Sequence, residues 1–267
     1  MREVLRRLEK GKISCDEAEK AIKLLALEEV GTLAKLDIGR DMRRGIPEIV
    51  IAEGKTPQGV AEITLAALAR QNRAIISRVN QQHVKAVQKA LRKDTVCSWN
   101  EKAQMLVVKS KGFTTAKTGG KVGILTAGTS DIPVAEEAKV IAEEMGCEVI
   151  TAYDVGVAGI HRLFKPLKDM LEKDVDAIIV VAGREGALAS VVAGLVDVAI
   201  IAVPVSSGYG FGGDGVTALM AMLQACPLGL AVVNVDGGVP AGSMAALIAN
   251  RVAKFRAATK KQKKLSP

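Results

Sequence analysis

From residue 121 onward, short apolar runs alternate regularly with longer amphipathic segments. The apolar runs predict five strands, at 122–126, 148–153, 177–182, 198–203 and 230–235. The amphipathic segments predict helices at 133–145, 159–171, 185–195, 215–224 and 241–255. Apolar strands that are each followed by a helix are typical of a doubly wound parallel sheet, for which the strand order 2-1-3-4-5 is the commonest solution. We therefore predict an α/β fold that binds its ligand outside the carboxyl ends of these strands.

The preceding residues are organised differently. Residues 1–30 read as a hairpin of two short helices, in which Ser14 and Glu17 have the spacing of a capping box. Residues 31–110 mix the two patterns and predict a smaller α/β domain. Its expected strands are 32–38, 48–52, 74–79, 96–99 and 104–108, and its expected helices are 57–71 and 82–92. The polar segment 111–120 ends in two glycines and is interpreted as a linker. The larger domain then spans 121–256, and a basic tail covers 257–267.

Two polar stretches of the smaller domain are candidates for binding an anionic ligand. Segment 37–48 is dense in acids and arginines and is either an exposed charged loop or a set of arginines aimed at an anionic ligand. Residues 53–56, Glu-Gly-Lys-Thr, lie between an expected strand and an expected helix. They form a second, weaker anion-site candidate and are too short for a Walker motif.

Charge and cysteine content exclude several classes of protein. The net charge is +8, but six of these charges lie in the acid-free stretch from Lys254 to the C-terminus, and +2 remains elsewhere. Because aromatic residues make up only 3% of the chain, base stacking is poorly served and nucleic-acid binding is not expected. No apolar stretch of membrane-spanning length is present, so we expect no membrane association. Four scattered cysteines without a CxxC pair argue against a zinc site and indicate a reducing compartment, most simply the cytoplasm.

The stretch Lys121–Ala138 carries the strongest functional signal. A predicted buried strand ends in Gly128-Thr129-Ser130-Asp131, and Pro133 then opens a helix. Two hydroxyls and the free amides of a helix start together suit an anion such as phosphate. Asp131 either caps the helix or meets a ribose hydroxyl, a metal ion or a proton in transfer. The turn is neither GxGxxG nor a Walker loop.

Further polar residues follow the other predicted strands. Glu185 is either a first-turn acid that suits the helix dipole or, beside Arg184, an acid/base at the mouth of a cleft. Residues 204–215 contain Ser207, Gly208, two aromatic residues and five glycines, which predicts a mobile loop that folds over a flat ligand. Asp214 in this loop is also a natural helix cap.

Two single residues complete the candidates. His161 starts a predicted helix and is either a base or a packing residue. Cys226 precedes the fifth predicted strand and, like most lone cysteines, is either inert or activated by a neighbour that the fold supplies.

The larger predicted domain resembles the aminoimidazole ribonucleotide carboxylase and mutase family. That family's Gly-Ser-x-Ser-Asp turn is matched by Gly128-Thr-Ser-Asp131, which is one residue shorter. Its Ala-Gly-x-x-x-His-Leu turn falls at Ala182–Leu188, so the family's catalytic histidine falls at Ala187. This departure argues against the purine reaction.

A second resemblance covers essentially the whole chain. It is to the pyridinium-3,5-biscarboxylic acid mononucleotide synthases, the carboxylase/hydrolases that begin nickel-pincer nucleotide synthesis for lactate racemase. The shared features are the 37–48 and 53–56 stretches, the 126–131 turn, Gly183-Arg-Glu-Gly186, Pro204-x-Ser-x-Gly-Tyr-Gly210 and Ala225-Cys-Pro227.

This resemblance implies a specific reaction. The enzyme would add CO2 to the pyridinium ring of nicotinic acid adenine dinucleotide and hydrolyse the phosphoanhydride to release AMP. It implies Cys226 as the nucleophile, Glu185 as the ring-proton base and Arg184 as the ligand of a carboxylate. Thr129 and Ser130 would bind the phosphate, and Asp131 would bind the ribose or transfer a proton. Magnesium at the pyrophosphate and a homo-octameric assembly are also implied. The alternatives are a purine-pathway carboxylase or mutase and a non-catalytic nucleotide-binding protein.

Overall fold

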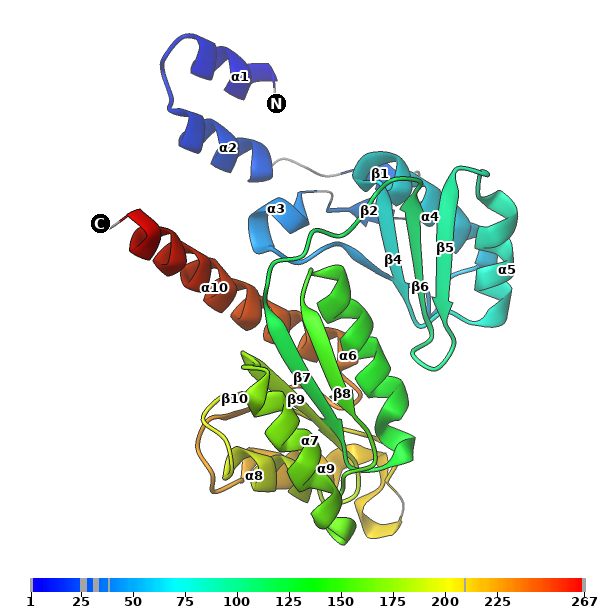
Figure 1. Cartoon of the computed structure of the whole chain (residues 1–267). Coiled ribbons are helices and arrows are strands. Elements are labelled where there is room, and N and C mark those ends of the chain that lie inside the picture. Colours follow the sequence, from blue (N-terminus) through cyan, green and yellow to red (C-terminus); the bar gives the residue numbers. More distant parts are fainter. Residues whose placement is uncertain (1, 25–27, 31–33, 38, 209, 266–267) are drawn as a thin grey trace. The chain divides into compact units, whose positions relative to one another are not determined.

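The chain folds as two compact units, which are described separately. The computed structural model describes residues 2–24, 28–30, 34–37, 39–208 and 210–265. The first unit spans Met1–Thr114 and the second Thr115–Pro267, so the division falls inside the segment that the sequence predicts as a linker (Figure 1).

The first unit is built on a four-stranded mixed sheet with the strand order β3-β4-β6-β5. Only β3 and β4 are parallel, and one apolar core joins the sheet to α4 and α5. Its elements are α1 (Arg2–Glu9), α2 (Cys15–Leu24), β1 (Glu28–Val30), β2 (Ala34–Leu36), α3 (Arg40–Arg44), β3 (Ile49–Ile51), α4 (Pro57–Gln71), β4 (Arg73–Ser77), α5 (Gln81–Ala90), β5 (Thr95–Asn100) and β6 (Met105–Ser110).

The start of this unit confirms some predictions and corrects others. Ser14 and Glu17 form the expected reciprocal capping hydrogen bonds. Residues 28–30, placed at the end of the helical hairpin, instead form β1 and pair with β2. Of the expected strand 32–38, residues 34–36 are a strand, while 32, 33 and 38 lie outside the described residues.

Segment 37–48 is not simply a loop, because it contains the short helix α3. Its arginines are held by acids: Arg43 pairs with Asp37, and Arg40 Nη1 lies 3.5 Å from Glu48 Oε2. Partial burial raises the pKa of Glu48 above its ordinary value despite this arginine.

The second unit is the predicted doubly wound domain. Its five strands are all parallel and lie in the order β11-β10-β9-β7-β8, which is the predicted order 2-1-3-4-5. The strands are β7 (Lys121–Thr126), β8 (Glu148–Ala152), β9 (Ala177–Ala182), β10 (Ala199–Pro204) and β11 (Leu230–Val232). Strand β9 is completely buried, as expected for a central strand covered on both faces.

Helices cover both faces of this sheet (Figure 1). On one face, α7 (His161–Glu172), α8 (Ala187–Ala193) and α9 (Val216–Leu223) share an apolar core with β9 and β10. On the other face, α6 (Ile132–Glu144) packs against α10 (Gly238–Leu265), largely through alanines. Three short 3-10 turns, Thr129–Asp131, Val157–Gly159 and Gly210–Gly215, precede α6, α7 and α9.

The helix boundaries differ from the predicted ones by a few residues at most ends, and two of the differences bear on the basic tail and the site. Helix α10 continues to Leu265, through most of the segment interpreted as a basic tail, and its C-terminal part extends beyond the sheet of its own unit (Figure 1). A run of lysine, alanine and glutamine residues has good helix propensity, so a solvated stretch of this kind prolongs an established helix. Helix α8 begins at Ala187 rather than at residue 185.

Within the described part of the chain, no helix has both the length and the apolar character needed to cross a bilayer.

Candidate functional site

A pocket of about 410 Å³ opens where the strands of the parallel sheet end. The loops that follow β7, β8, β9 and β10 all contribute to its lining, as the sequence predicts for the carboxyl edge. Its size suits a nucleotide-sized ligand. The loop after β11 does not line it. The lining residues are Ala127, Gly128, Ser130, Asp131, Asp154, Gly156, Val157, Ala158, Arg162, Ala182, Gly183, Arg184, Glu185, Ala187, Leu188 and Ser207.

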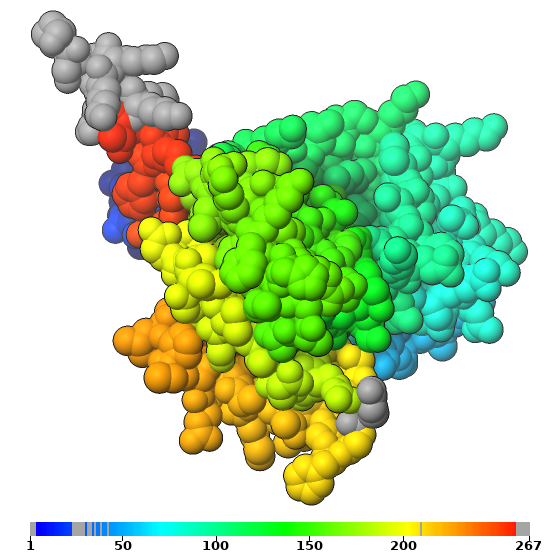
Figure 2. Space-filling view, turned by 60° about the horizontal axis from the view of Figure 1, so that its bottom comes forward, coloured from blue at the N-terminus to red at the C-terminus, as the bar shows by residue number. Residues whose placement is uncertain are grey.

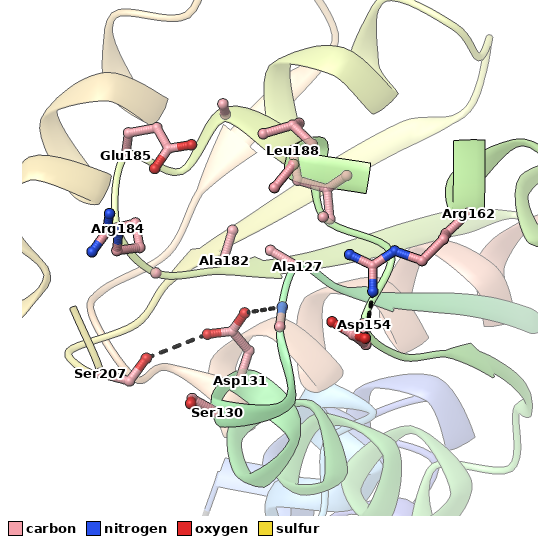
Figure 3. Close-up of a pocket in the computed structure, with 16 residues that line it drawn as sticks. Ala127, Ser130, Asp131, Asp154, Arg162, Ala182, Arg184, Glu185, Leu188 and Ser207 are labelled. Carbon is pink, nitrogen blue, oxygen red and sulfur yellow. Dashed lines mark hydrogen bonds and ion pairs between the residues drawn. The ribbon is translucent and has the colours of Figure 1, made fainter. Parts of the chain in front are cut away.

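The turn after β7 forms one wall and carries a buried carboxyl group. Asp131 is only 4% exposed, and its Oδ2 accepts a hydrogen bond from the Gly128 amide at 2.8 Å. Asp131 stands at the N-cap position of α6 but makes no side-chain capping bond to it; its carboxylate instead caps the preceding 3-10 turn, Thr129–Asp131, through the Gly128 amide. Its other oxygen points toward Ser207, which also lines the pocket (Figure 3).

The environment of Asp131 favours its protonated form. Burial raises the pKa of this carboxyl above its ordinary value of 3.8, although hydrogen bonds from Gly128, Ser207, Gly183 and Ala127 oppose the shift. Desolvation is therefore the stronger effect. A buried acid of raised pKa at a pocket wall is suited to proton transfer.

The loop after β8 brings an ion pair into the pocket. Arg162, at the start of α7, donates from Nη1 to Asp154, and both side chains line the cavity (Figure 3). Gly156 allows this loop to lie against the first one, since a Cβ there would stand 2.5 Å from the Ala127 carbonyl oxygen. The guanidinium of Arg162 can present further N–H groups to an anion.

The loop after β9 places two charged side chains on the opposite part of the pocket. Arg184 and Glu185 lie in a tight turn closed by a hydrogen bond from the Gly186 amide to the Gly183 carbonyl, 2.9 Å long. Both are exposed and line the cavity. Glu185 precedes α8, so its interpretation as a first-turn acid is wrong. Ala187 also lines the pocket, and none of the described lining residues is histidine.

The loop after β10 forms the part of the pocket lining next to Asp131. Ser207 Oγ donates to Asp131 Oδ1 at 3.4 Å. The loop after β11 supports this arrangement, because Asp236 Oδ1 accepts a hydrogen bond from the Ser206 amide at 2.9 Å. Gly208 follows against the Arg184 backbone. Asp214 has a left-handed backbone, and α9 is capped by Gly215 without a side-chain bond, so the expected Asp214 cap is absent.

Cys226 lies away from the pocket of its own chain. It is exposed and precedes β11, and the strands of this sheet are parallel. It therefore lies toward the edge where the strands begin, whereas the pocket lies where they end.

The structure thus gathers part of the predicted site. Gly128, Ser130, Asp131, Arg184, Glu185 and Ser207 line one pocket. Thr129, His161, Gly208, Asp214 and Cys226 do not line it. Sequence reasoning missed Asp154 and Arg162, although an acid directly after the second strand and an arginine at the following helix start were a usable signal.

The described residues do not form a metal site of their own. No group of three His, Cys, Asp or Glu side chains in this part of the chain is arranged to hold a metal ion. Magnesium commonly uses one or two carboxylates together with phosphate oxygens of a substrate. Asp131, Asp154 and Glu185 are the carboxylates among the residues that line the pocket.

Comparison with known proteins places both units in described families. Residues 27–111 match the LarB/PurE-like N-terminal domain, and residues 121–266 match AIR carboxylase. An uncharacterized protein of Methanocaldococcus jannaschii is 48% identical over 253 residues, which cover 93% of this chain and 96% of that protein. N5-carboxyaminoimidazole ribonucleotide mutases are more distant. The mutase of Thermotoga maritima is 30% identical to this chain over 48% of this chain and 74% of its own length. The mutase of Pyrococcus abyssi is 30% identical over 47% of this chain and 71% of its own length.

Proposed function

Because the chain belongs to the LarB family, a carboxylase-type family that joins a LarB/PurE-like N-terminal domain to an AIR carboxylase domain, we propose that it carboxylates a pyridinium nucleotide. The substrates are nicotinic acid adenine dinucleotide and CO2. The products are a pyridinium-3,5-biscarboxylate mononucleotide and AMP. The observation that carries this proposal is a pocket of about 410 Å³ that is lined by Ser130, Arg162 and the buried Asp131, and in which Ala187 stands at the position where the resemblance to the purine-pathway family predicts a histidine.

The phosphate of the mononucleotide half binds at the turn after β7. The Ser130 hydroxyl and the Arg162 guanidinium both line the pocket, whereas Thr129 belongs to the same turn as Ser130 but does not line the pocket. An anion gains a charge-assisted bond from arginine and hydrogen bonds from hydroxyls. Asp131 lies deeper than this phosphate site, and it either accepts a hydrogen bond from a ribose hydroxyl or transfers a proton.

The ring reaction requires a nucleophile, because a pyridinium ring is electron-poor and does not attack CO2. A thiolate that adds to a ring carbon leaves a neutral dihydropyridine with a nucleophilic carbon. That carbon forms the new C–C bond to CO2. Loss of its proton, followed by departure of the thiolate with its electron pair, restores the aromatic ring. Cys226 supplies the thiolate in this proposal.

Two residues of the turn after β9 have the chemistry for the remaining steps. The Glu185 carboxylate takes the ring proton, and the Arg184 guanidinium holds a ring carboxylate bidentately. Both side chains line the same part of the pocket, beside Ser207 (Figure 3). We therefore place the ring beside Arg184 and Glu185, and the phosphate between Ser130 and Arg162.

Cys226 reaches such a ring only from a second copy of the chain, since it lies at the opposite edge of its own sheet. The surface around it suits assembly. Val216, Met220 and Leu223 form an exposed apolar stripe on α9, and Leu228 is 92% exposed. Apolar surface of this kind marks protein interfaces. A closed homo-octamer that joins this surface of one copy to the pocket of another completes each site.

Hydrolysis of the phosphoanhydride releases AMP when water attacks phosphorus and the P–O bond to the other phosphate breaks. Magnesium would enter with the pyrophosphate of the substrate, because this ion commonly combines one or two carboxylates with substrate phosphate oxygens, and it would supply charge stabilisation there.

The relatives named N5-carboxyaminoimidazole ribonucleotide mutase favour one alternative, a purine-pathway carboxylase or mutase. Ala187 argues against it, because an alanine has no group to transfer a proton. A non-catalytic nucleotide-binding protein is the other alternative. Turnover of aminoimidazole ribonucleotide would support the first, and binding without turnover the second.

The proposal is tested by incubating the protein with nicotinic acid adenine dinucleotide, bicarbonate and magnesium and weighing the products by mass spectrometry. AMP and a mononucleotide that is heavier by one carboxyl group are expected from the wild type and not from Cys226→Ala. Product from both proteins would remove Cys226 from its role, and no product from the wild type would overturn the proposed reaction.

A further inference from the structure

The aromatic side chain of Phe211 is fully exposed to solvent. Its exposure is 109% of the reference value, the highest among the large apolar residues of the described chain. A phenyl ring in this position gains nothing from the hydrophobic effect in the isolated chain. Such a ring gains stability only when a ligand or another protein surface covers it.

The position of Phe211 relative to the pocket favours a ligand. Ser207, four residues earlier, lines the pocket, so the two Cα atoms are at most about 14 Å apart. The intervening Gly208 lies against the backbone of Arg184, which lines the same end of the pocket. In Figure 2 the yellow segment after residue 209 projects from the surface of the second unit.

The described lining of the pocket offers no aromatic surface to a ring. Its described lining residues include small, aliphatic and charged side chains but no Phe, Tyr or Trp. Arg184, Glu185 and Ser207 lie at one end, and Arg162 with Asp154 lies at the other (Figure 3). The loop that carries Phe211 leaves from the first end, where the reacting ring lies in the proposed function.

The backbone next to Phe211 has open space on one side and is packed on the other. A Cβ at Gly210 would meet no heavy atom within 4 Å, and the same holds for Gly213. A Cβ at Gly212, directly after Phe211, would lie 2.5 Å from Thr217 Oγ1. Room for Phe211 to shift is therefore found on the Gly210 side. The following Gly215, in contrast, is packed closely against Val205 and Val235 and anchors the end of the loop.

We propose that Phe211 packs on the face of the reacting heteroaromatic ring of the bound nucleotide. This inference rests on the proposed function. A phenyl face attracts a cationic ring such as a pyridinium, both by stacking and through its quadrupole. Phe211 therefore holds the ring in place while Arg184 and Glu185 contact its substituents.

The test uses a tryptophan reporter at the same position. Phe211→Trp is made in a Trp99→Phe background, which removes the one native tryptophan. The matched control is Phe164→Trp in the same background, because Phe164 is exposed on α7 and does not line the pocket. Nicotinic acid adenine dinucleotide is titrated into each protein. We expect saturable quenching at position 211 only, since an electron-poor pyridinium quenches a stacked indole.

Kinetics supply a second readout. Phe211→Ala is expected to raise KM for the dinucleotide about tenfold, as for loss of one stacked base, with Phe164→Ala unchanged. The role of Phe211 would be overturned if the protein forms product while position 211 shows no quenching and Phe211→Ala leaves KM unchanged. A smaller assembly of Phe211→Ala with normal KM would also overturn it, because the ring would then contact a second copy. If the wild type forms no product, the proposed function fails, and quenching alone decides the ring contact.

Discussion

Ser207 and Asp131, which are 76 residues apart in the chain, are joined by a hydrogen bond from Ser207 Oγ to Asp131 Oδ1 of 3.4 Å. The bond links the loop after β10 to the turn after β7, and the central strand β9 lies between these two strands. The carboxyl group is therefore fixed on one side by the Gly128 amide and on the other by a hydroxyl. This arrangement orients an acid toward the pocket while burial keeps water from it.

If Asp131 takes part in catalysis, replacing its carboxyl group by a neutral amide should cause a large loss of turnover. Asp131→Asn keeps an oxygen that can accept from the Gly128 amide but cannot exchange a proton. We expect turnover of the dinucleotide to fall about a hundredfold or more, with the fold retained. Ser207→Ala, which removes only the hydroxyl donor, should cost much less. Turnover close to that of the wild type in Asp131→Asn would show that the carboxyl group is only structural.

The same residue predicts a pH dependence of stability. Because the pKa of Asp131 is raised in the folded protein, the folded chain binds its proton more tightly than the unfolded chain does. The contribution of Asp131 to the free energy of unfolding therefore decreases as pH rises from the ordinary value of 3.8 through the raised pKa. Urea unfolding across this range should show a smaller decrease for Asp131→Asn. Identical pH profiles would contradict the raised pKa.

Gly183 predicts a steric effect on the same contact. A Cβ at this position would lie 3.0 Å from Ser207 Oγ and 3.5 Å from Asp131 Oδ1. Gly183→Ala should push Ser207 aside and lower turnover severalfold without unfolding the protein. Gly194→Ala is the matched control, because its Cβ would meet only ordinary contacts at 3.6 Å. Equal turnover of the two variants would show that the contact does not matter.

Arg162 predicts a change in substrate affinity. Arg162→Lys keeps the charge but loses the planar fork that binds a phosphate bidentately. We expect a KM for the dinucleotide about tenfold higher with a smaller change in kcat, measured by steady-state kinetics. Lys165→Gln, on an exposed side of the same helix, is the control. A fall in kcat alone would argue against a phosphate-binding role.

Much of the second unit follows from its sequence. The apolar run 177–182 matches β9 residue for residue, and the strand order is the predicted one because parallel strands with short crossovers allow few arrangements. The Asp154–Arg162 pair was missed, since it depends on a left-handed turn at Asp154 and on close packing at Gly156. Neither is visible in hydrophobic periodicity. The separation of Cys226 from the pocket follows only from the sheet topology.

That separation makes a prediction about assembly. If each site combines Cys226 of one copy with Asp131 of another, two inactive variants should complement each other. Cys226→Ala and Asp131→Asn, co-expressed with different tags and purified as mixed assemblies, should recover part of the wild-type turnover. A double variant co-expressed with the wild type controls for dilution. Mixed assemblies as inactive as the parents would place both residues in the site of one chain or remove one of them from it.

The central claim is that this protein forms a carbon–carbon bond to a pyridinium ring. Its most direct test is incubation with nicotinic acid adenine dinucleotide and ¹³C-bicarbonate, followed by mass spectrometry and NMR of the mononucleotide fraction. We predict one labelled carboxyl group on the ring carbon and an equal amount of AMP. A second incubation supplies aminoimidazole ribonucleotide in place of the dinucleotide. If the dinucleotide gains no label and aminoimidazole ribonucleotide does, the claim is contradicted and the protein is a purine-pathway carboxylase.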